Sequence, residues 1–87
     1  MPSPVVPSNE QPESVRAILA ENVIRLRRQM GWSQEGLAYE AGLHRTFIAH
    51  VERRVRNISL DNIERLAKAL NVAPYTLLVP PVIGRSS

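Results

Sequence analysis

The chain has 87 residues and a mass of 9.8 kDa, which allows one domain with a small, compact core. It contains no cysteine, so a disulfide scaffold, a cysteine-based zinc finger and a thiol nucleophile are excluded. No apolar run approaches the roughly 20 residues that span a bilayer, and no secretory signal is visible near the start. We therefore expect a cytoplasmic protein with no membrane partner.

The charge balance is moderately basic. Eleven basic residues stand against eight acidic ones, which gives a net charge of +3, and Lys68 is the only lysine among the eleven. Arginine forms paired hydrogen bonds with phosphate groups and with guanine edges, which lysine cannot copy. The arginine excess could equally be a compositional habit of the source genome, so the charge alone only hints at nucleic acid.

The two ends of the chain differ in composition from its middle. Residues 1–12 hold four prolines and no helical period, which predicts a flexible arm. Residues 80–87 begin with two prolines and predict a short tail. The folded domain is therefore expected over residues 13–79.

Apolar residues recur every three or four positions in this domain, and no segment alternates with period two, so the fold class is predicted to be all-α. Five helices are expected, over residues 13–30, 34–41, 44–52, 60–70 and 75–79. Residues that favour a left-handed backbone follow the first, second and fourth of them: Gly31, Gly42 and Asn71. Val15 and Leu60 are expected on the inner faces of their helices.

The second and third expected helices are short and are joined through Gly42, an arrangement typical of a helix-turn-helix. Leu37, Ile48 and Val51 are expected to point inward. The third helix then exposes one side with the hydrogen-bonding residues His44, Arg45, Thr46, His50 and Arg53. An exposed helix fits the major groove of B-DNA, which is about 12 Å wide.

The run over residues 33–70 resembles the phage-repressor helix-turn-helix family, the Cro/lambda-repressor-like or XRE type. The resemblance covers about residues 20–79 and rests on Gln34, Leu37, Ala38, Gly42, Leu43, Ile48, Val51, Glu52, Ser59 and Leu60. It implies a compact five-helix lambda-repressor-like bundle with the helix-turn-helix as its second and third helices. It also implies a nucleoid-associated transcriptional regulator that binds a palindromic double-stranded DNA operator as a homodimer. Controllers of restriction–modification systems form a subgroup of similar size.

Functional positions are carried over from this resemblance residue by residue. The positions that read DNA bases match His44, Arg45, Thr46 and His50. The positions that contact the phosphate backbone match Gln34, Arg53, Arg54, Arg56 and Asn57. Arg27 and Glu52 match a pair that joins the first and third helices by a salt bridge. The chain departs from the family where Gly36 replaces an acidic residue, Arg54 a glycine and Ile58 a proline.

The segment 72–79 is too apolar for a free chain end. Its short helix cannot bury both of its sides on one neighbour. We expect Tyr75, Leu78 and Val79 to face a partner subunit and Leu77 to turn to the core. The alternative is that all four residues cover the core of the monomer.

Simpler interpretations of the other site residues also stay open. Arg53, Arg54 and Arg56 could form a solvated run, and Thr46 could bond to its own helix backbone. His50 could be a packing residue. His44 and His50 are six positions apart and so do not share one helix face as paired metal ligands would, and no metal or cofactor is expected.

The sequence does not predict an enzyme. It contains no catalytic triad pattern, no phosphate-binding glycine loop and no metalloprotease motif. No small-molecule effector is expected, because the chain has no room for an effector domain. The alternative function is an antitoxin or an adaptor that uses the same fold to bind a protein. The sequence does not determine the operator, the role of the arm, or whether the protein activates or represses transcription. It also leaves open whether the context is a phage, a controller or an antitoxin.

Overall fold

The computed structural model describes residues 14–81, and this part of the chain forms four α-helices and one 3-10 helix, with no strand. The elements are α1 (Val15–Gln29), α2 (Gln34–Ala41), α3 (Arg45–Glu52), α4 (Leu60–Leu70) and η1 (Pro74–Leu78). The predicted all-α fold class is thereby confirmed. The expected arm, Glu13, and residues 82–87 of the expected tail lie outside the described residues. None of the helices between residues 14 and 81 has the length and apolar character needed to cross a membrane.

The expected fifth α-helix is instead the 3-10 helix η1. Its hydrogen bonds have three-residue spacing, from the amide of Thr76 to the carbonyl of Ala73 at 2.9 Å and from Val79 to Thr76 at 3.4 Å. Pro80 disfavours a helical backbone at the residue before it, and Val79 is accordingly extended, with φ −100° and ψ 129°. The segment between Pro74 and Pro80 is therefore too short to settle into an α-helix.

Serine side chains cap three of the α-helices at their N-termini. The hydroxyls of Ser14, Ser33 and Ser59 each accept a hydrogen bond of 3.0 to 3.1 Å from the amide three residues further on. Helix α1 therefore begins two residues later than expected. Helix α3 begins at Arg45 instead of His44, which is its N-cap and makes no side-chain capping bond.

All four α-helices are followed by a residue with left-handed backbone: Gly31, Gly42, Arg54 and Asn71. At the end of α3, the amide of Arg54 bonds to the carbonyl of Val51 at 3.0 Å and the amide of Val55 to that of His50 at 3.1 Å. This pair of bonds is a Schellman motif, which requires a left-handed backbone at Arg54. Arg54, with φ 66°, is one of the positions at which the chain is expected to depart from the family that it resembles. A left-handed backbone costs a residue with a β-carbon roughly 1–2 kcal/mol.

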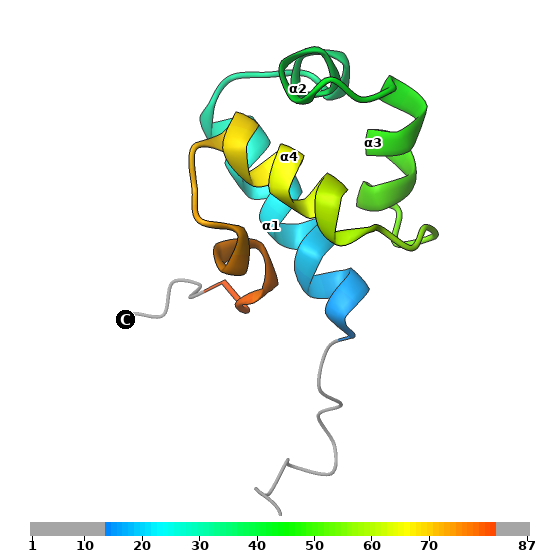
Figure 1. Ribbon diagram of the computed structural model, residues 1–87, viewed down its shortest axis with the longest axis vertical. Coiled ribbons are helices and arrows are strands. Elements are labelled where there is room, and N and C mark those ends of the chain that lie inside the picture. The colour runs from blue at the N-terminus through cyan, green and yellow to red at the C-terminus, as the bar shows by residue number, and fades with distance from the viewer. Residues whose placement is uncertain (1–13, 82–87) are drawn as a thin grey trace, which may run out of the picture.

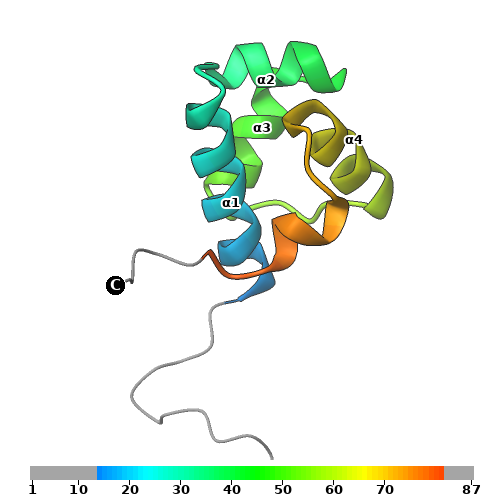
Figure 2. The same ribbon diagram turned by 90° about the vertical axis from the view of Figure 1, so that its left-hand side faces the viewer.

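The helices surround one hydrophobic core (Figures 1 and 2). Helix α2 packs on α3 and α4, helix α3 on α1, and η1 closes the other end against α1 and α4. The buried core residues are Leu19, Val23, Leu26, Leu37, Ala38, Ala41, Ile48, Val51, Ile63, Leu66, Ala67, Leu70 and Leu77. This packing leaves the side of α3 that faces away from α1 and α2 uncovered.

Two residues that were expected on inner helix faces are exposed. Leu60 has 78% of its surface accessible and Val15 has 63%. Each is the first residue of its helix, so it lies beyond the edge of the core although its position in the apolar period is right. The sequence prediction for both is therefore wrong.

Asn22 is a fully buried polar residue of α1. Its Nδ2 donates to the carbonyl of Leu77 at 2.8 Å and to that of Val79 at 2.9 Å, and its Oδ1 accepts from Arg25 at 2.9 Å. These bonds satisfy the buried amide group of Asn22, and they fix the segment after α4 against α1. Sequence reasoning missed Asn22 because an asparagine within an amphipathic helix is usually solvated.

Candidate nucleic-acid interface

The helix-turn-helix is built from α2, α3 and the turn at Gly42, which has a left-handed φ of 71°. Leu37, Ile48 and Val51 have at most 2% of their surface exposed and hold the two helices to the rest of the core. Because these apolar positions all face inward, the orientation of α3 is set by packing. Its outward side is free to meet another molecule.

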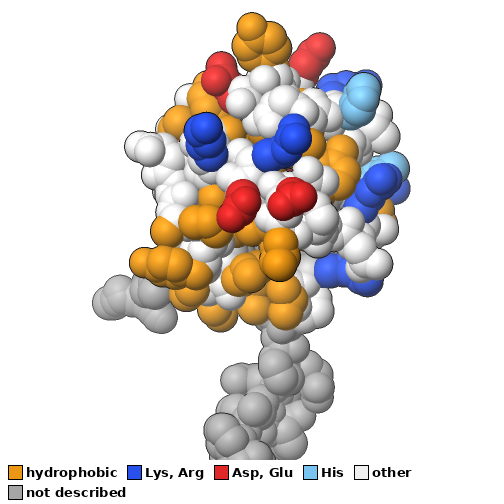
Figure 3. All heavy atoms as spheres, viewed as in Figure 1, with side chains coloured by type: hydrophobic (Ala, Val, Ile, Leu, Met, Phe, Trp, Pro, Cys, Tyr) orange, Lys and Arg blue, Asp and Glu red, His pale blue; other side chains and the backbone are white. Residues whose placement is uncertain are grey.

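The four expected base-reading residues lie along α3. His44, Arg45 and Thr46 are exposed at the start of the helix, and His50 is half-buried in its last turn. Recognition helices contact base edges mainly from their N-terminal residues, which is where the three exposed residues lie. On the edge of the molecule that carries α3, arginine and histidine side chains gather in Figure 3.

The expected phosphate-binding residues differ in how they are held. Arg53, Arg54, Arg56 and Asn57 are exposed in and after the last turn of α3. Arg54 lies 3.5 Å from a carboxylate oxygen of Glu21, and Asn57 accepts a hydrogen bond from Arg16. Gln34 is engaged inside the protein, since its Nε2 donates to Oε1 of Glu52 at 2.8 Å.

Arg27 and Glu52 form an ion pair with only 11% and 6% of their side chains exposed. Nε and Nη2 of Arg27 donate to the two carboxylate oxygens of Glu52 at 2.6 and 3.0 Å, a bidentate geometry. Nη1 of Arg27 also donates to the carbonyl of Trp32 at 2.9 Å. Together with Gln34, this pair fastens the end of α3 to α1 and to the start of α2.

Exposed apolar residues gather in the lower half of Figure 3. We call Val15, Leu60, Tyr75, Leu78 and Val79 the apolar patch. Between 37% and 78% of the surface of each is exposed. Val15, Leu60 and Leu78 also line a cavity of about 450 Å³. Leu77, by contrast, is fully buried, so η1 turns Leu77 to the core while its residues Tyr75 and Leu78 are exposed.

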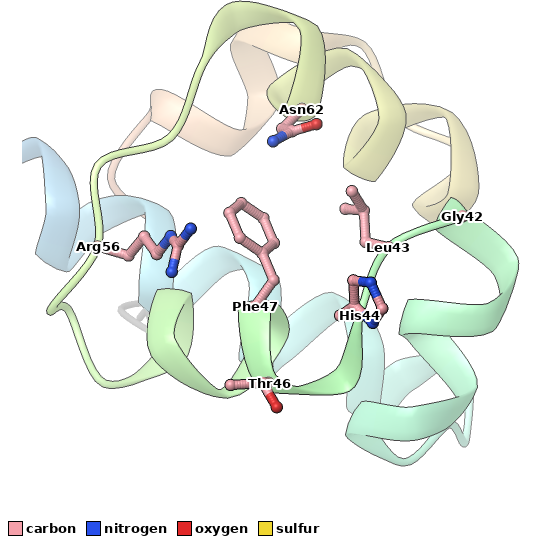
Figure 4. A pocket seen from close by; sticks show the side chains of 7 residues that line it. All are labelled: Gly42, Leu43, His44, Thr46, Phe47, Arg56 and Asn62. Carbon is pink, nitrogen blue, oxygen red and sulfur yellow. The ribbon is translucent and has the colours of Figure 1, made fainter.

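A second cavity, of about 410 Å³, lies beside α3 and is shown in Figure 4. Its lining residues are Gly42, Leu43, His44, Thr46, Phe47, Arg56 and Asn62. The guanidinium carbon of Arg56 lies 5.3 Å from the centroid of the Phe47 ring. Sequence reasoning assigned Phe47 no function, because an aromatic residue on the apolar side of a helix is usually part of the core.

Comparison with known proteins identifies the family. The helix-turn-helix family HTH_3 matches residues 23–77. The chain belongs to this family. The predicted resemblance is thereby confirmed, and the chain carries the DNA-binding domain of a family of transcriptional regulators.

Two relatives are similar over most of the chain. A hypothetical transcription factor of Neisseria meningitidis serogroup B is 52% identical over 69 residues, which are 79% of this chain and 65% of that protein. This chain therefore spans slightly less than two thirds of that relative. The control protein C.BamHI of Bacillus amyloliquefaciens is 46% identical over 72 residues, which are 82% of this chain and 89% of that protein. These relatives are regulators and control proteins, not enzymes.

Solved structures show the same fold. The crystal structure of the transcription factor NHTF from Neisseria has a TM-score of 0.78 and 51% identity, over 83% of this chain and 85% of that one. The restriction–modification controller protein C.Esp1396I, solved as a tetramer with its natural 35-base-pair operator, has a TM-score of 0.68 and 29% identity. That match covers 76% of this chain and 87% of the controller chain.

Proposed function

We propose that this chain is a sequence-specific transcriptional regulator of the restriction–modification controller type, which binds a palindromic operator as a homodimer. The observation that carries the proposal is the uncovered, polar side of α3. Core packing and the buried Arg27–Glu52 pair hold this helix rigidly, and a rigid helix with exposed hydrogen-bonding side chains suits the major groove. The similarity to C.BamHI supports the controller role.

In this proposal the contacts are divided between bases and backbone. His44, Arg45 and Thr46 read base edges from the first turn of α3, while Arg54 and Arg56 bind phosphates beside it. Selection of bound sequences from random DNA with the purified protein tests the whole proposal, because a dimer should recover a palindrome. The affinity should also fall steeply with salt, since phosphate contacts release counterions. Recovery of no shared motif, together with a flat salt dependence, would refute DNA as the partner.

Arg45→Ala should weaken operator binding by roughly 1–3 kcal/mol and relax the preference at one base pair of each half-site. The physical reason is that an exposed arginine in the first turn can form two hydrogen bonds with a guanine edge. The measurement is an affinity titration against the selected operator and single-base variants of it. Lys68→Ala is the charge-matched control, because Lys68 is exposed on α4 away from α3. Equal losses on operator and random DNA would mean that Arg45 touches only the backbone.

Arg54→Gly should raise the stability of the protein while weakening its DNA binding. Glycine relieves the left-handed strain at φ 66°, and a net gain of up to about 1 kcal/mol is expected in chemical denaturation. Loss of the guanidinium should at the same time reduce the affinity for all DNA sequences and lower the salt slope. Arg54→Ala is the matched variant, since it removes the same charge and keeps the strain. If the glycine variant is no more stable than the alanine variant, the strain is not real.

The homodimer is proposed to form through the apolar patch. One recognition helix covers only a few base pairs, which is too little for specific binding in a genome. A two-fold dimer doubles the contacted sequence and spaces its two recognition helices about 34 Å apart. The patch is an apolar surface that the monomer core leaves uncovered, and the C.Esp1396I complex supports binding as an oligomer.

A further inference from the structure

Arg56 and Phe47 face each other across the cavity beside α3 (Figure 4). Phe47 comes from α3 and packs against the core with part of its surface, while Arg56 comes from the connection between α3 and α4 and is exposed. The distance of 5.3 Å between the guanidinium carbon and the ring centroid is within the range of a cation–π interaction. The ring is therefore the fixed partner of this pair, and the arginine is the movable one.

Among the described residues, Arg56 makes no hydrogen bond, although its neighbours Val55 and Asn57 each make one. Residues 55–59 have no regular secondary structure, and a long arginine side chain loses rotamer freedom when it grips a phosphate. Within residues 14–81, Arg56 has no carboxylate within ion-pair distance, whereas Arg54 approaches Glu21. The positive charge of Arg56 is therefore not neutralised by a described neighbour, and its guanidinium group lies over the Phe47 ring instead.

A stacked arginine keeps its hydrogen-bonding capacity. In a stacked pair of this kind, the ring interacts with the face of the guanidinium group, while the N–H donors lie in the plane of that group and point outward from its edge. An arginine held in this way can donate to a phosphate oxygen without first leaving its partner. Contact with Phe47 thus lowers the entropy cost of binding and leaves the binding edge free.

We propose that Phe47 is a positioning residue for DNA binding, whose ring holds Arg56 beside α3 in the orientation that binds a backbone phosphate. This inference rests on the proposed DNA-binding function and adds to it a residue that does not itself touch DNA. Phe47 acts through Arg56, so removal of the ring should have no effect on affinity once Arg56 is absent.

A double-mutant cycle on a random-sequence DNA duplex tests this dependence, because phosphate contacts need no particular sequence. Phe47→Leu should weaken binding by about two- to fivefold for each subunit bound, the range expected for an exposed cation–π pair. In an Arg56→Ala background, Phe47→Leu should weaken binding no further. The salt slope should fall in Arg56→Ala and stay unchanged in Phe47→Leu, because only the former removes a charge. Phe47→Tyr keeps the ring and should bind like the wild type.

A measurement on the unmutated protein covers the case in which Phe47→Leu does not fold. In the absence of DNA, NMR should show the side-chain protons of Arg56 shifted upfield by the ring current of Phe47, unlike those of the exposed Arg65. Shifts like those of a free arginine would overturn the proposal, and so would equal losses from Phe47→Leu in both backgrounds. If the wild type binds DNA but Arg56→Ala is without effect, this inference fails while the proposed function stands. If the wild type does not bind DNA, the proposed function itself fails.

Discussion

Arg27→Ala is expected to lower the free energy of unfolding by about 3–5 kcal/mol, the cost of leaving one partner of a buried ion pair alone. The substitution removes both hydrogen bonds from Arg27 to the Glu52 carboxylate. Only 6% of the Glu52 side chain is exposed to solvent. Among residues 14–81, only Gln34 would then remain as a hydrogen-bond partner of that charge. The bond from Arg27 to the carbonyl of Trp32 would be lost as well. Chemical denaturation followed by circular dichroism measures the change.

Two further variants show whether the loss comes from the unpaired charge. Arg27→Met combined with Glu52→Leu should recover part of the stability, because it replaces the pair by apolar side chains of similar size. Arg28→Ala removes the neighbouring arginine, which is exposed, and should change the stability by no more than about 0.5 kcal/mol. An Arg27→Ala protein that unfolds with the wild-type midpoint would mean that the pair contributes nothing.

The effect of Arg27→Ala on DNA binding should be smaller than its effect on stability. Arg27 lies on α1 and Glu52 at the end of α3, away from the exposed first turn of α3, and neither is proposed to contact DNA. At a temperature where the variant is still folded, its affinity for DNA should therefore stay close to that of the wild type. The pair supports the recognition helix, and its loss should leave the base-reading residues in place.

Local signals in the sequence were sufficient for most of the fold. Serine before an apolar period, and Gly31, Gly42 or Asn71 after it, place the helix ends within one or two residues, because capping depends on near neighbours in the chain. The fifth α-helix is predicted wrongly because Pro80 restricts Val79 to an extended backbone, which the apolar pattern of the segment does not reveal. The left-handed Arg54 could be anticipated only as a departure from the family.

Features that depend on tertiary packing were less accessible. Periodicity identifies which side of a helix faces inward but not where the core ends, so Val15 and Leu60 were placed inside although both are exposed. The partners of Asn22 lie more than fifty residues away in the sequence, in η1 and at Val79. The engagement of Gln34 by Glu52 depends likewise on the meeting of α2 and α3. No local pattern encodes contacts of this range.

The apolar patch is the surface on which the proposed assembly depends. Three of its members, Tyr75, Leu78 and Val79, come from the segment that Asn22 fixes against α1, and they have 72%, 37% and 50% of their surface exposed. Val15 and Leu60 extend the same surface beyond that segment, and with Leu78 they line one cavity. A second copy of the chain that covers this patch would bury it from water on both subunits, which is the main driving force for association.

Leu78→Asp should therefore convert a dimer into a monomer, because it places a charged carboxylate in a mainly apolar interface. Operator affinity should then fall by about 10²–10⁴-fold, since each subunit would bind its half-site without the other. Analytical ultracentrifugation and an operator titration measure the two effects. Tyr39→Asp is the control, because Tyr39 is 82% exposed on α2 outside the patch and should leave the dimer intact. If the wild type is a monomer at micromolar concentration, or if Leu78→Asp remains a dimer, the two subunits do not meet through this patch.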